Sequence, residues 1–394
     1  MQAGSGVSQR EEATMAQNPS TRLHGLHEQG QSVWLDYIRR GIIDNGELEG
    51  MIREYDLRGV TSNPSIFEEA IGKSDDYDDE MEFLAADGAE ADEAFETLAV
   101  SDIQRTCDLF RPIYDAANGH DGLVSMEVSP LLASDTQRSV DEARRLWKLV
   151  GRPNLMIKIP GTDEGIPAIE QLLSEGINVN ITLLFSLAGY ERVMEAFLRG
   201  MERRAEAGQP LDRVASVASF FVSRVDTAVD AELEAIAKEG GPNAEKAKAV
   251  MGRAAIANAK LAYQRFTEVF SGERWERLAA KGAQVQRPLW ASTSTKNPAY
   301  RDVIYIESLI GPHTVNTIPL ATLEAFNDHG EVRRTVDEGV DQARAELATL
   351  KELGIDLEAV TEKLQVEGVE KFSKAFNQMI RAVGEKLARV AQGT

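Results

Sequence analysis

The feature that most constrains this chain is a regular alternation of short apolar runs with longer segments of helical periodicity. Amphipathic helices are expected between the runs, for example over residues 139–150, 165–175, 186–207 and 300–310. Eight units of a strand followed by a helix predict a closed barrel of parallel strands, the (β/α)8 TIM barrel of the α/β class. The eight candidate strands are residues 33–37, 57–61, 123–128, 155–159, 177–182, 214–222, 288–292 and 314–318. A doubly wound sheet uses the same repeat, but the first strand is not followed by a glycine-rich GxGxxG turn.

Several segments exceed a minimal barrel. Residues 67–118 and 226–282 are predicted to be helical additions on its exterior, and residues 331–390 to form C-terminal helices over 331–353 and 357–390. Phe372 and Phe376, four residues apart, are expected to dock the last helix rather than bind substrate. Residues 1–18 are polar and aperiodic, so we expect a disordered leader, followed by a single barrel domain over 19–394.

Composition narrows the possible partners. Of the 394 residues, 43% are hydrophobic and 27% charged, which is typical of a globular protein, and the net charge of −21 argues against nucleic acid or an anionic membrane. The single cysteine, Cys107, excludes an internal disulfide, and no apolar stretch is long enough to span a bilayer. We therefore expect a cytoplasmic protein that is a monomer or a homodimer.

Metal and cofactor sites are not predicted. The five histidines are scattered without metal-ligand spacing, which disfavours a metal-dependent enzyme. The acidic run at 75–80 lacks the spacing of a calcium loop and is interpreted as a solvated surface.

A lysine lies within the apolar run at 155–161. Because side chains alternate along a strand, Met156 and Lys158 point to the face opposite Leu155, Ile157 and Ile159. Desolvation lowers the pKa of an amine from its usual ~10.4 and makes it nucleophilic, which indicates Schiff-base formation with a carbonyl substrate. A lysine that extends to the strand end or pairs with a carboxylate is the alternative.

Polar residues on the other strands favour the catalytic interpretation. They fall near the carboxyl ends of the strands, which form one mouth of a barrel, where enzymes of this architecture have their active sites. Together they would place acids, amides and hydroxyls around Lys158. These residues are Asp36, Glu127, Asn178, Asn180, Thr182, Ser219 and Ser292.

These segments resemble the signature motifs of the transaldolases. The most specific is Thr61-Ser62-Asn63-Pro64-Ser65, followed by the lysine strand in the matching order; the other matching segments are 124–128, 156–161, 178–186 and 218–224. The resemblance extends from about Ser32 to the last helix. It implies a class I aldolase-type barrel that transfers a dihydroxyacetone unit from sedoheptulose 7-phosphate or fructose 6-phosphate to glyceraldehyde 3-phosphate or erythrose 4-phosphate, a reaction of the pentose phosphate pathway.

The resemblance also implies roles for individual residues. Lys158 corresponds to the Schiff-base lysine, Glu127 to an acid/base acting through a water held by Thr182, and Asp36 to the group that handles the substrate hydroxyl proton at carbon–carbon cleavage. No metal or cofactor is required. Asn63 and Asn180 resemble residues that hold sugar hydroxyls, with Ser219 and Phe221 shaping the pocket; for Asn63, an Asn-Pro turn without ligand is the alternative.

Phosphate recognition departs from the family pattern. Arg224 resembles a phosphate-binding arginine, but Lys296 stands where many relatives have an arginine in a Ser-x-Arg segment. A lysine ammonium cannot form the two parallel hydrogen bonds that a guanidinium makes, so it binds phosphate with a different geometry. We expect Arg224, Ser292 and Lys296 to bind phosphate; surface salt bridges and a helix cap are the alternatives.

Two other functions compete with the transferase. One is a fructose-6-phosphate aldolase acting on free dihydroxyacetone, although Glu127 differs from the acid/base of those enzymes. The other is an inactive barrel that binds sugar phosphates. The preferred acceptor aldose does not follow from the sequence.

Overall fold

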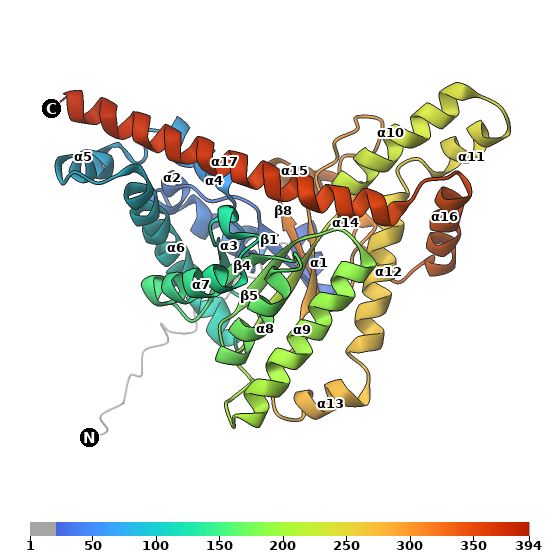
Figure 1. The fold of residues 1–394 in the computed structure, drawn as a ribbon, viewed down its shortest axis with the longest axis horizontal. Coiled ribbons are helices and arrows are strands. Elements are labelled where there is room, and N and C mark those ends of the chain that lie inside the picture. The colour runs from blue at the N-terminus through green and yellow to red at the C-terminus, as the bar shows by residue number, and fades with distance from the viewer. Residues whose placement is uncertain (1–20, 394) are drawn as a thin grey trace, which may run out of the picture.

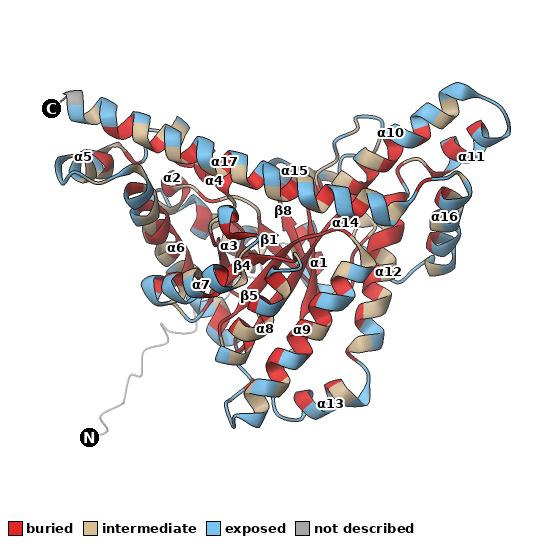
Figure 2. Cartoon of the chain, viewed as in Figure 1, coloured by how far each residue is buried: buried red, intermediate tan, exposed pale blue. Residues whose placement is uncertain are grey.

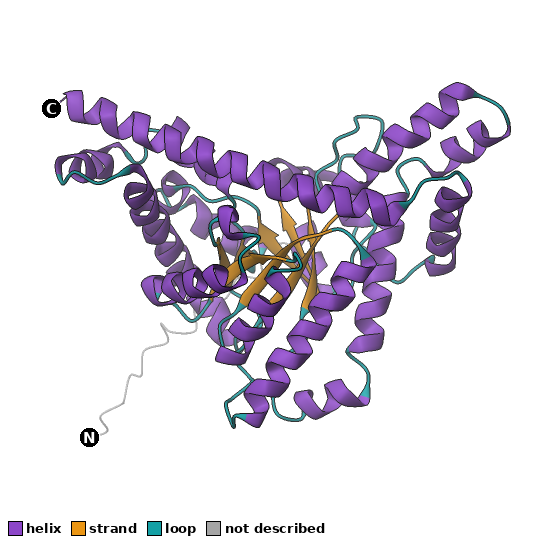
Figure 3. Cartoon of the chain, viewed as in Figure 1, coloured by secondary structure: helices purple, strands orange, loops and turns teal. Residues whose placement is uncertain are grey.

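The eight predicted runs all form parallel strands, which close into a barrel in chain order, β1-β2-β3-β4-β5-β6-β7-β8. The computed structural model describes residues 21–393, so the leader expected at 1–18 lies outside the described part. The strands lie at the centre, surrounded by helices (Figure 3). They are β1 Gln31–Leu35, β2 Gly59–Val60, β3 Leu123–Glu127, β4 Leu155–Pro160, β5 Val179–Leu184, β6 Ser216–Phe221, β7 Arg287–Ala291 and β8 Thr314–Ile318.

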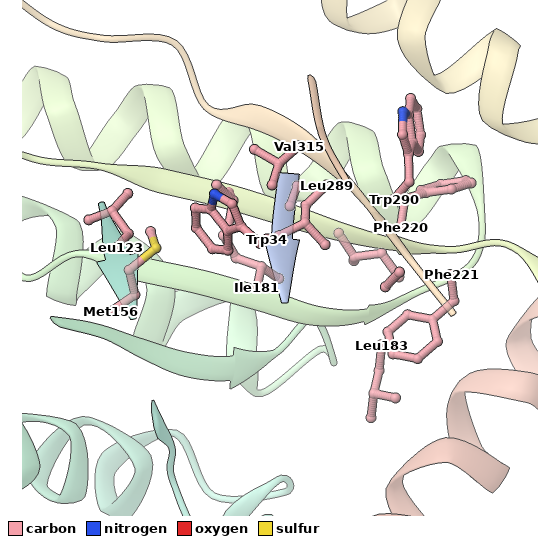
Figure 4. Close-up of a cluster of buried hydrophobic side chains, with 14 of the residues drawn as sticks. Trp34, Leu123, Met156, Ile181, Leu183, Phe220, Phe221, Leu289, Trp290 and Val315 are labelled. Atoms are coloured by element: carbon pink, nitrogen blue, oxygen red, sulfur yellow. The ribbon is translucent and has the colours of Figure 1, made fainter. Parts of the chain in front are cut away.

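The barrel interior is packed with side chains rather than open. Trp34 and Leu289 are fully buried, and both appear among the clustered side chains of Figure 4. Gly59 is paired with Trp34 across β1 and β2, and a Cβ at this glycine would lie 2.6 Å from the indole ring. A larger residue at position 59 would therefore displace the tryptophan that fills the middle of the barrel.

A buried ion pair closes the barrel at the amino ends of the strands. Arg287 on β7 lies 3.4 Å from Asp121, and its guanidinium also donates to the Ser32 hydroxyl at 2.7 Å. The Trp34 indole N–H donates to the same carboxylate at 3.1 Å. The polar groups at this end thus satisfy one another, away from the opposite mouth.

The helices cover the barrel with their apolar faces, while their outer faces are exposed (Figure 2). They are α1 Arg22–Glu28, α2 Arg40–Asp44, α3 Glu47–Tyr55, α4 Pro64–Lys73, α5 Asp78–Ala86, α6 Ala91–Ala116, the 3-10 helix η1 Pro130–Leu132, α7 Thr136–Val150, α8 Gly165–Glu175, α9 Leu187–Glu206, α10 Ser223–Glu239, α11 Pro242–Val250, α12 Ala254–Val269, α13 Glu273–Ala279, α14 Ile304–Glu307, α15 Leu320–His329, α16 Val340–Glu352 and α17 Leu357–Gly393. Among residues 21–393, no helix is both long enough and apolar enough to cross a membrane.

Two of the predicted helices are wrong in extent. Residues 300–310 contain only the short helix α14. Just before it, the Thr295 hydroxyl donates toward the carbonyls of Arg301 and Asp302, both at 3.0 Å, and the Arg301 carbonyl also accepts from the Ile304 N–H in a single tight turn. The predicted helix 331–353 begins only at Val340. Before it, the backbone N–H groups of Thr335 and Val336 donate to the Ile310 carbonyl, which holds this stretch against the end of the preceding β/α unit.

The last helix, α17, crosses the mouth of the barrel at the carboxyl ends of the strands. It is the long red helix of Figure 1, and it packs on α4, α5 and α10. Gln365 fixes its first half by donating to the carbonyls of Gly161 and Leu183, at 3.1 and 3.0 Å. These carbonyls follow Lys158 and Thr182 in the chain, so α17 is anchored beside two predicted site residues.

Candidate active site

A cavity of about 220 Å³ opens at the carboxyl ends of the strands, beneath α17. Nine of the eleven predicted site residues line it: Asp36, Asn63, Lys158, Thr182, Ser219, Phe221, Arg224, Ser292 and Lys296. The other two, Glu127 and Asn180, lie directly behind this lining and contact residues of it. The sequence therefore identified side chains that the fold brings together from the seven strands β1 to β7 and the segments that follow them.

Lys158 projects from β4 toward the cavity and is paired across the strands with Glu127 of β3. Its Nζ lies 3.5 Å from Glu127 Oε2 and donates to the Ser62 carbonyl at 3.1 Å. Both side chains are 7% exposed. The lysine does pair with a carboxylate, which was the structural alternative, but it does so while facing a cavity rather than within a closed salt bridge.

Glu127 and Thr182 each have a buried oxygen with spare capacity for a hydrogen bond. Within the described residues, Thr182 Oγ1 has no hydrogen-bond partner, and Glu127 Oε2 has only the 3.5 Å ion-pair contact with Lys158 Nζ. Burial raises the pKa of Glu127 above its ordinary value, against the opposing effect of the Lys158 ammonium. A carboxyl group in such surroundings is suited to give and take a proton.

Asp36 follows β1 directly and faces the same cavity. The Thr61 hydroxyl donates to Asp36 Oδ1 at 2.7 Å and also lies 2.5 Å from the Thr317 hydroxyl. Burial raises the pKa of Asp36, while Lys158 and Thr61 act in the opposite direction. Burial therefore raises the pKa of both carboxyl groups of the site, Asp36 and Glu127.

Two asparagines were predicted to hold sugar hydroxyls, and the structure places them differently. Asn180 is fully buried on β5; its amide donates to Ser125 Oγ at 2.9 Å and accepts from Ser219 Oγ at 2.7 Å. Asn63 lines the cavity, and its Oδ1 caps α4 by accepting from the Ile66 N–H at 3.1 Å. Asn63 therefore both forms the local turn and lines the cavity. Asn178, also grouped with these residues, instead donates to the Pro153 and Leu155 carbonyls away from the cavity.

Cationic and hydroxyl groups gather at the other end of the cavity. Arg224 begins α10, with its guanidinium carbon 5.1 Å from the centre of the Phe221 ring. Lys296 donates to Ser294 Oγ at 2.7 Å, and the hydroxyls of Ser223 and Ser292 are 3.0 Å apart. Two cations beside serine hydroxyls form a set of donors suited to a phosphate group.

Seven of the residues that line the cavity were not predicted as site residues, and three of them bear on its chemistry. Thr61 lies in the motif that was quoted, and its hydrogen bond to Asp36 could have been anticipated from adjacent strand ends. Ser294 stands two residues before Lys296 and lines the cavity with it. Phe372 of α17 is buried in the core, as a docking residue would be, and also lines the cavity, whereas Phe376 packs against Phe95. The sequence carried no signal that this ring would face the strand ends.

In the part of the chain that the structure describes, no group of three or more His, Cys, Asp or Glu side chains is arranged to hold a metal ion. Cys107 is buried in α6, and burial raises the pKa of its thiol, so it is not a nucleophile of this site.

The site is that of a barrel protein with a lysine and two carboxyl groups at one mouth, and comparison with known proteins gives its family. Residues 33–383 match the family model described as Transaldolase/Fructose-6-phosphate aldolase. A protein of Parafrankia sp. (strain EAN1pec) named Transaldolase is 51% identical over 373 residues, which cover 94% of this chain and 100% of the relative.

Other similar proteins carry the same name. One from Acidothermus cellulolyticus is 50% identical over 368 residues, covering 93% of this chain and 97% of the relative. One from Trichodesmium erythraeum is 46% identical over 375 residues, covering 94% and 99%. This chain belongs to the transaldolase/fructose-6-phosphate aldolase family.

Proposed function

We propose a specific role for each of the main cavity residues in the transaldolase reaction that this chain catalyses. The amine of Lys158 attacks the ketone carbon of a ketose phosphate, and loss of water gives a protonated imine. Glu127 supplies and accepts the protons of this dehydration through a water that Thr182 holds. This assignment is supported by Thr182 Oγ1, which is buried without a hydrogen-bond partner, and by Glu127 Oε2, whose only close partner is Lys158 Nζ.

Carbon–carbon cleavage then depends on Asp36. It takes the proton from the hydroxyl on the carbon beyond the bond that breaks, an aldose phosphate leaves, and the bonding electrons move into the imine to form an enamine. The enamine carbon attacks the aldehyde carbon of a second aldose phosphate, whose oxygen receives a proton from Asp36. Hydrolysis of the new imine frees the product and the Lys158 amine. The iminium nitrogen accepts the bonding electrons when the carbon–carbon bond breaks, and the enamine returns them when the new bond forms.

The remaining lining residues are proposed to orient the sugar phosphate. Arg224, Ser292, Ser294 and Lys296 bind the phosphate at one end, which places the ketone near Lys158 at the other. Asn63 and Ser219 bind hydroxyl groups of the chain between these ends. Asn180 holds Ser219 in place through their hydrogen bond.

The buried Lys158–Glu127 contact of 3.5 Å supports the proposal most directly, because Lys158 lines a cavity that the cations Arg224 and Lys296 also line. It is tested by measuring transfer from fructose 6-phosphate to erythrose 4-phosphate in the Lys158→Arg and Lys158→Met variants. Arginine keeps the charge and methionine the bulk, but neither has an amine that forms an imine. Loss of transfer in both folded variants, with fructose 6-phosphate still bound, supports the proposal; transfer by Lys158→Arg would refute it.

We further propose that residues 19–394 act as one domain, that the protein is cytoplasmic, and that it works as a monomer or homodimer. The acidic net charge of −21 supports a small-molecule enzyme rather than one directed to nucleic acid or an anionic membrane. Size-exclusion chromatography with light scattering distinguishes the two assemblies.

A further inference from the structure

A phenyl ring from the last helix lies over the lysine. The centre of the Phe372 ring is 5.7 Å from Lys158 Nζ, and Phe372 lines the cavity from the side opposite the strand ends. Lys158 is on β4 and Phe372 is more than two hundred residues later, on α17. The lysine is thus enclosed by Glu127 on the barrel side and by an apolar ring on the helix side.

The position of the ring is fixed by anchors on either side of it. Toward the start of α17, Gln365 donates to the Gly161 and Leu183 carbonyls. Gly368 lies against Leu183 so closely that an added Cβ would come within 2.8 Å of its side chain. Because these contacts involve the chain just beyond Lys158 and Thr182, α17 cannot shift at this point without disturbing the strand ends.

A second set of anchors lies beyond the ring. Phe376 packs edge-on against Phe95, with ring centres 6.1 Å apart, and Phe95 packs edge-on against Phe67 at 5.6 Å. Further along, Lys386 donates to the Ser74 carbonyl at 2.5 Å, at the end of α4. Contacts on both sides of Phe372 along α17 therefore fix the helix, and with it the ring, over Lys158.

The ring's position has a chemical consequence for the intermediate that a transfer enzyme must preserve. After cleavage, the enamine on Lys158 has to wait for the second aldehyde. If a proton adds to its carbon and water adds to the resulting iminium carbon, the carbon–nitrogen bond breaks, free dihydroxyacetone leaves, and the amine is regenerated without transfer. Water must therefore be kept from the Lys158 intermediate after the first aldehyde has left and before the second one binds.

We propose that Phe372 is a positioning residue that shields the Lys158 intermediate from water and so favours transfer over release of dihydroxyacetone. The inference rests on the proposed role of Lys158. The apolar ring excludes water from the helix side, and its face favours a cation at Nζ, which the iminium form also carries.

The test compares Phe372→Leu, Phe372→Val and Phe372→Ala with the wild type, a series in which the side chain over Lys158 shrinks stepwise. Val366→Ala is the matched control, since Val366 lies on the same helix and is 56% exposed. Two rates are measured for each variant: transfer from fructose 6-phosphate to erythrose 4-phosphate, and release of dihydroxyacetone from fructose 6-phosphate without acceptor. The lifetime of the intermediate is measured by removing free sugar, waiting, and trapping what remains with borohydride.

We expect the ratio of release to transfer to rise along the series, by about tenfold or more in Phe372→Ala, with a shortened lifetime of the trapped adduct. Val366→Ala should match the wild type. Equal ratios and lifetimes in all folded variants, even with slower transfer, would overturn the inference and leave Phe372 a packing residue. Absence of any adduct on Lys158 in the wild type would instead refute the proposed function itself, so the two failures are distinguishable. Phe372→Leu and Phe372→Val keep the test decisive if Phe372→Ala does not fold.

Discussion

Lys158 and Glu127 occupy directly paired positions on neighbouring strands, with Nζ and Oε2 3.5 Å apart and both side chains 7% exposed. Removal of two charges from water is costly, and a pair that served only stability could be replaced by apolar residues with little loss. This pair instead lies at the base of a polar cavity. Its arrangement fits the proposed chemistry, in which a proton passes between an amine, a substrate and a carboxyl group.

Glu127→Gln should slow the reaction and remove one limb of its pH profile. Burial raises the pKa of Glu127 above its ordinary value of 4.5, so the group keeps its proton to a higher pH than an exposed glutamate. Loss of a general acid/base costs about 10²–10⁴ in rate. The check is kcat between about pH 4 and about pH 9 in both proteins. A variant profile with the same limb as the wild type would assign that limb to another group, such as Asp36.

Arg224→Ala should weaken phosphate binding more than Lys296→Ala, because Arg224 is partly buried and offers a fork of donors while Lys296 is exposed. Loss of a hydrogen bond to a charged group corresponds to an increase in KM of about 10- to 100-fold. Lys296→Arg should bind at least as tightly as the wild type. The KM for fructose 6-phosphate is compared with that of Lys238→Ala, a control whose side chain is 78% exposed on α10. Unchanged KM in both alanine variants would place the phosphate elsewhere.

Asp226→Asn should stabilise the protein near neutral pH and not in acid. Asp226 is 1% exposed, accepts from the Ala255 N–H and the Tyr305 hydroxyl, and burial raises its pKa from 3.8 to about 6. Since the folded state holds this proton more tightly than the unfolded state, stability is greatest below pH 3.8 and declines as the pH rises through about 6.

The decrease in the free energy of unfolding that Asp226 causes as the pH rises is at most about 3 kcal/mol, and the asparagine variant lacks it. Urea unfolding of the two proteins at about pH 4 and about pH 7 measures the difference in free energy of unfolding. That difference should move in favour of the variant as the pH rises. A difference that stays constant with pH would mean that Asp226 does not titrate in this window.

Arg287→Met should destabilise the fold without acting on the chemistry. It would leave the buried carboxylate of Asp121 without its cation at the end of the barrel opposite the cavity, a loss of about 3–5 kcal/mol. Arg333→Ala breaks an exposed ion pair with Glu338 and should cost less than about 1 kcal/mol. Thermal and urea unfolding check both values. Equal stability of the two variants would show that the Arg287–Asp121 pair contributes no more than a surface contact.

The barrel could be predicted because each strand carries its own signal: buried parallel strands are continuous apolar runs, and all eight were found in the correct order. The cavity could be predicted from the same pattern, because the carboxyl ends of all the strands lie at the same end of the barrel and polar residues there line one mouth. The motif resemblance then added Asn63 and Arg224, which follow their strands and carry no strand periodicity.

What could not be predicted depends on contacts between distant parts of the chain. The helix predicted at 300–310 is shortened to α14, and the Thr295 hydroxyl donates toward two carbonyls just before it, a contact that local periodicity does not reveal. Phe372 and Phe376 look alike in sequence, as an apolar pair one helical turn apart. Only the angle at which α17 crosses the barrel places one ring against Phe95 and the other over Lys158.

Borohydride reduction in the presence of fructose 6-phosphate shows whether Lys158 forms the covalent intermediate. Reduction converts the imine to a stable secondary amine, which peptide mass spectrometry locates. We expect a dihydroxyacetone-derived adduct on Lys158, absent without sugar and absent in Lys158→Met. A folded, active protein that carries no adduct, or carries it on another lysine, would show that Lys158 is not the Schiff-base residue.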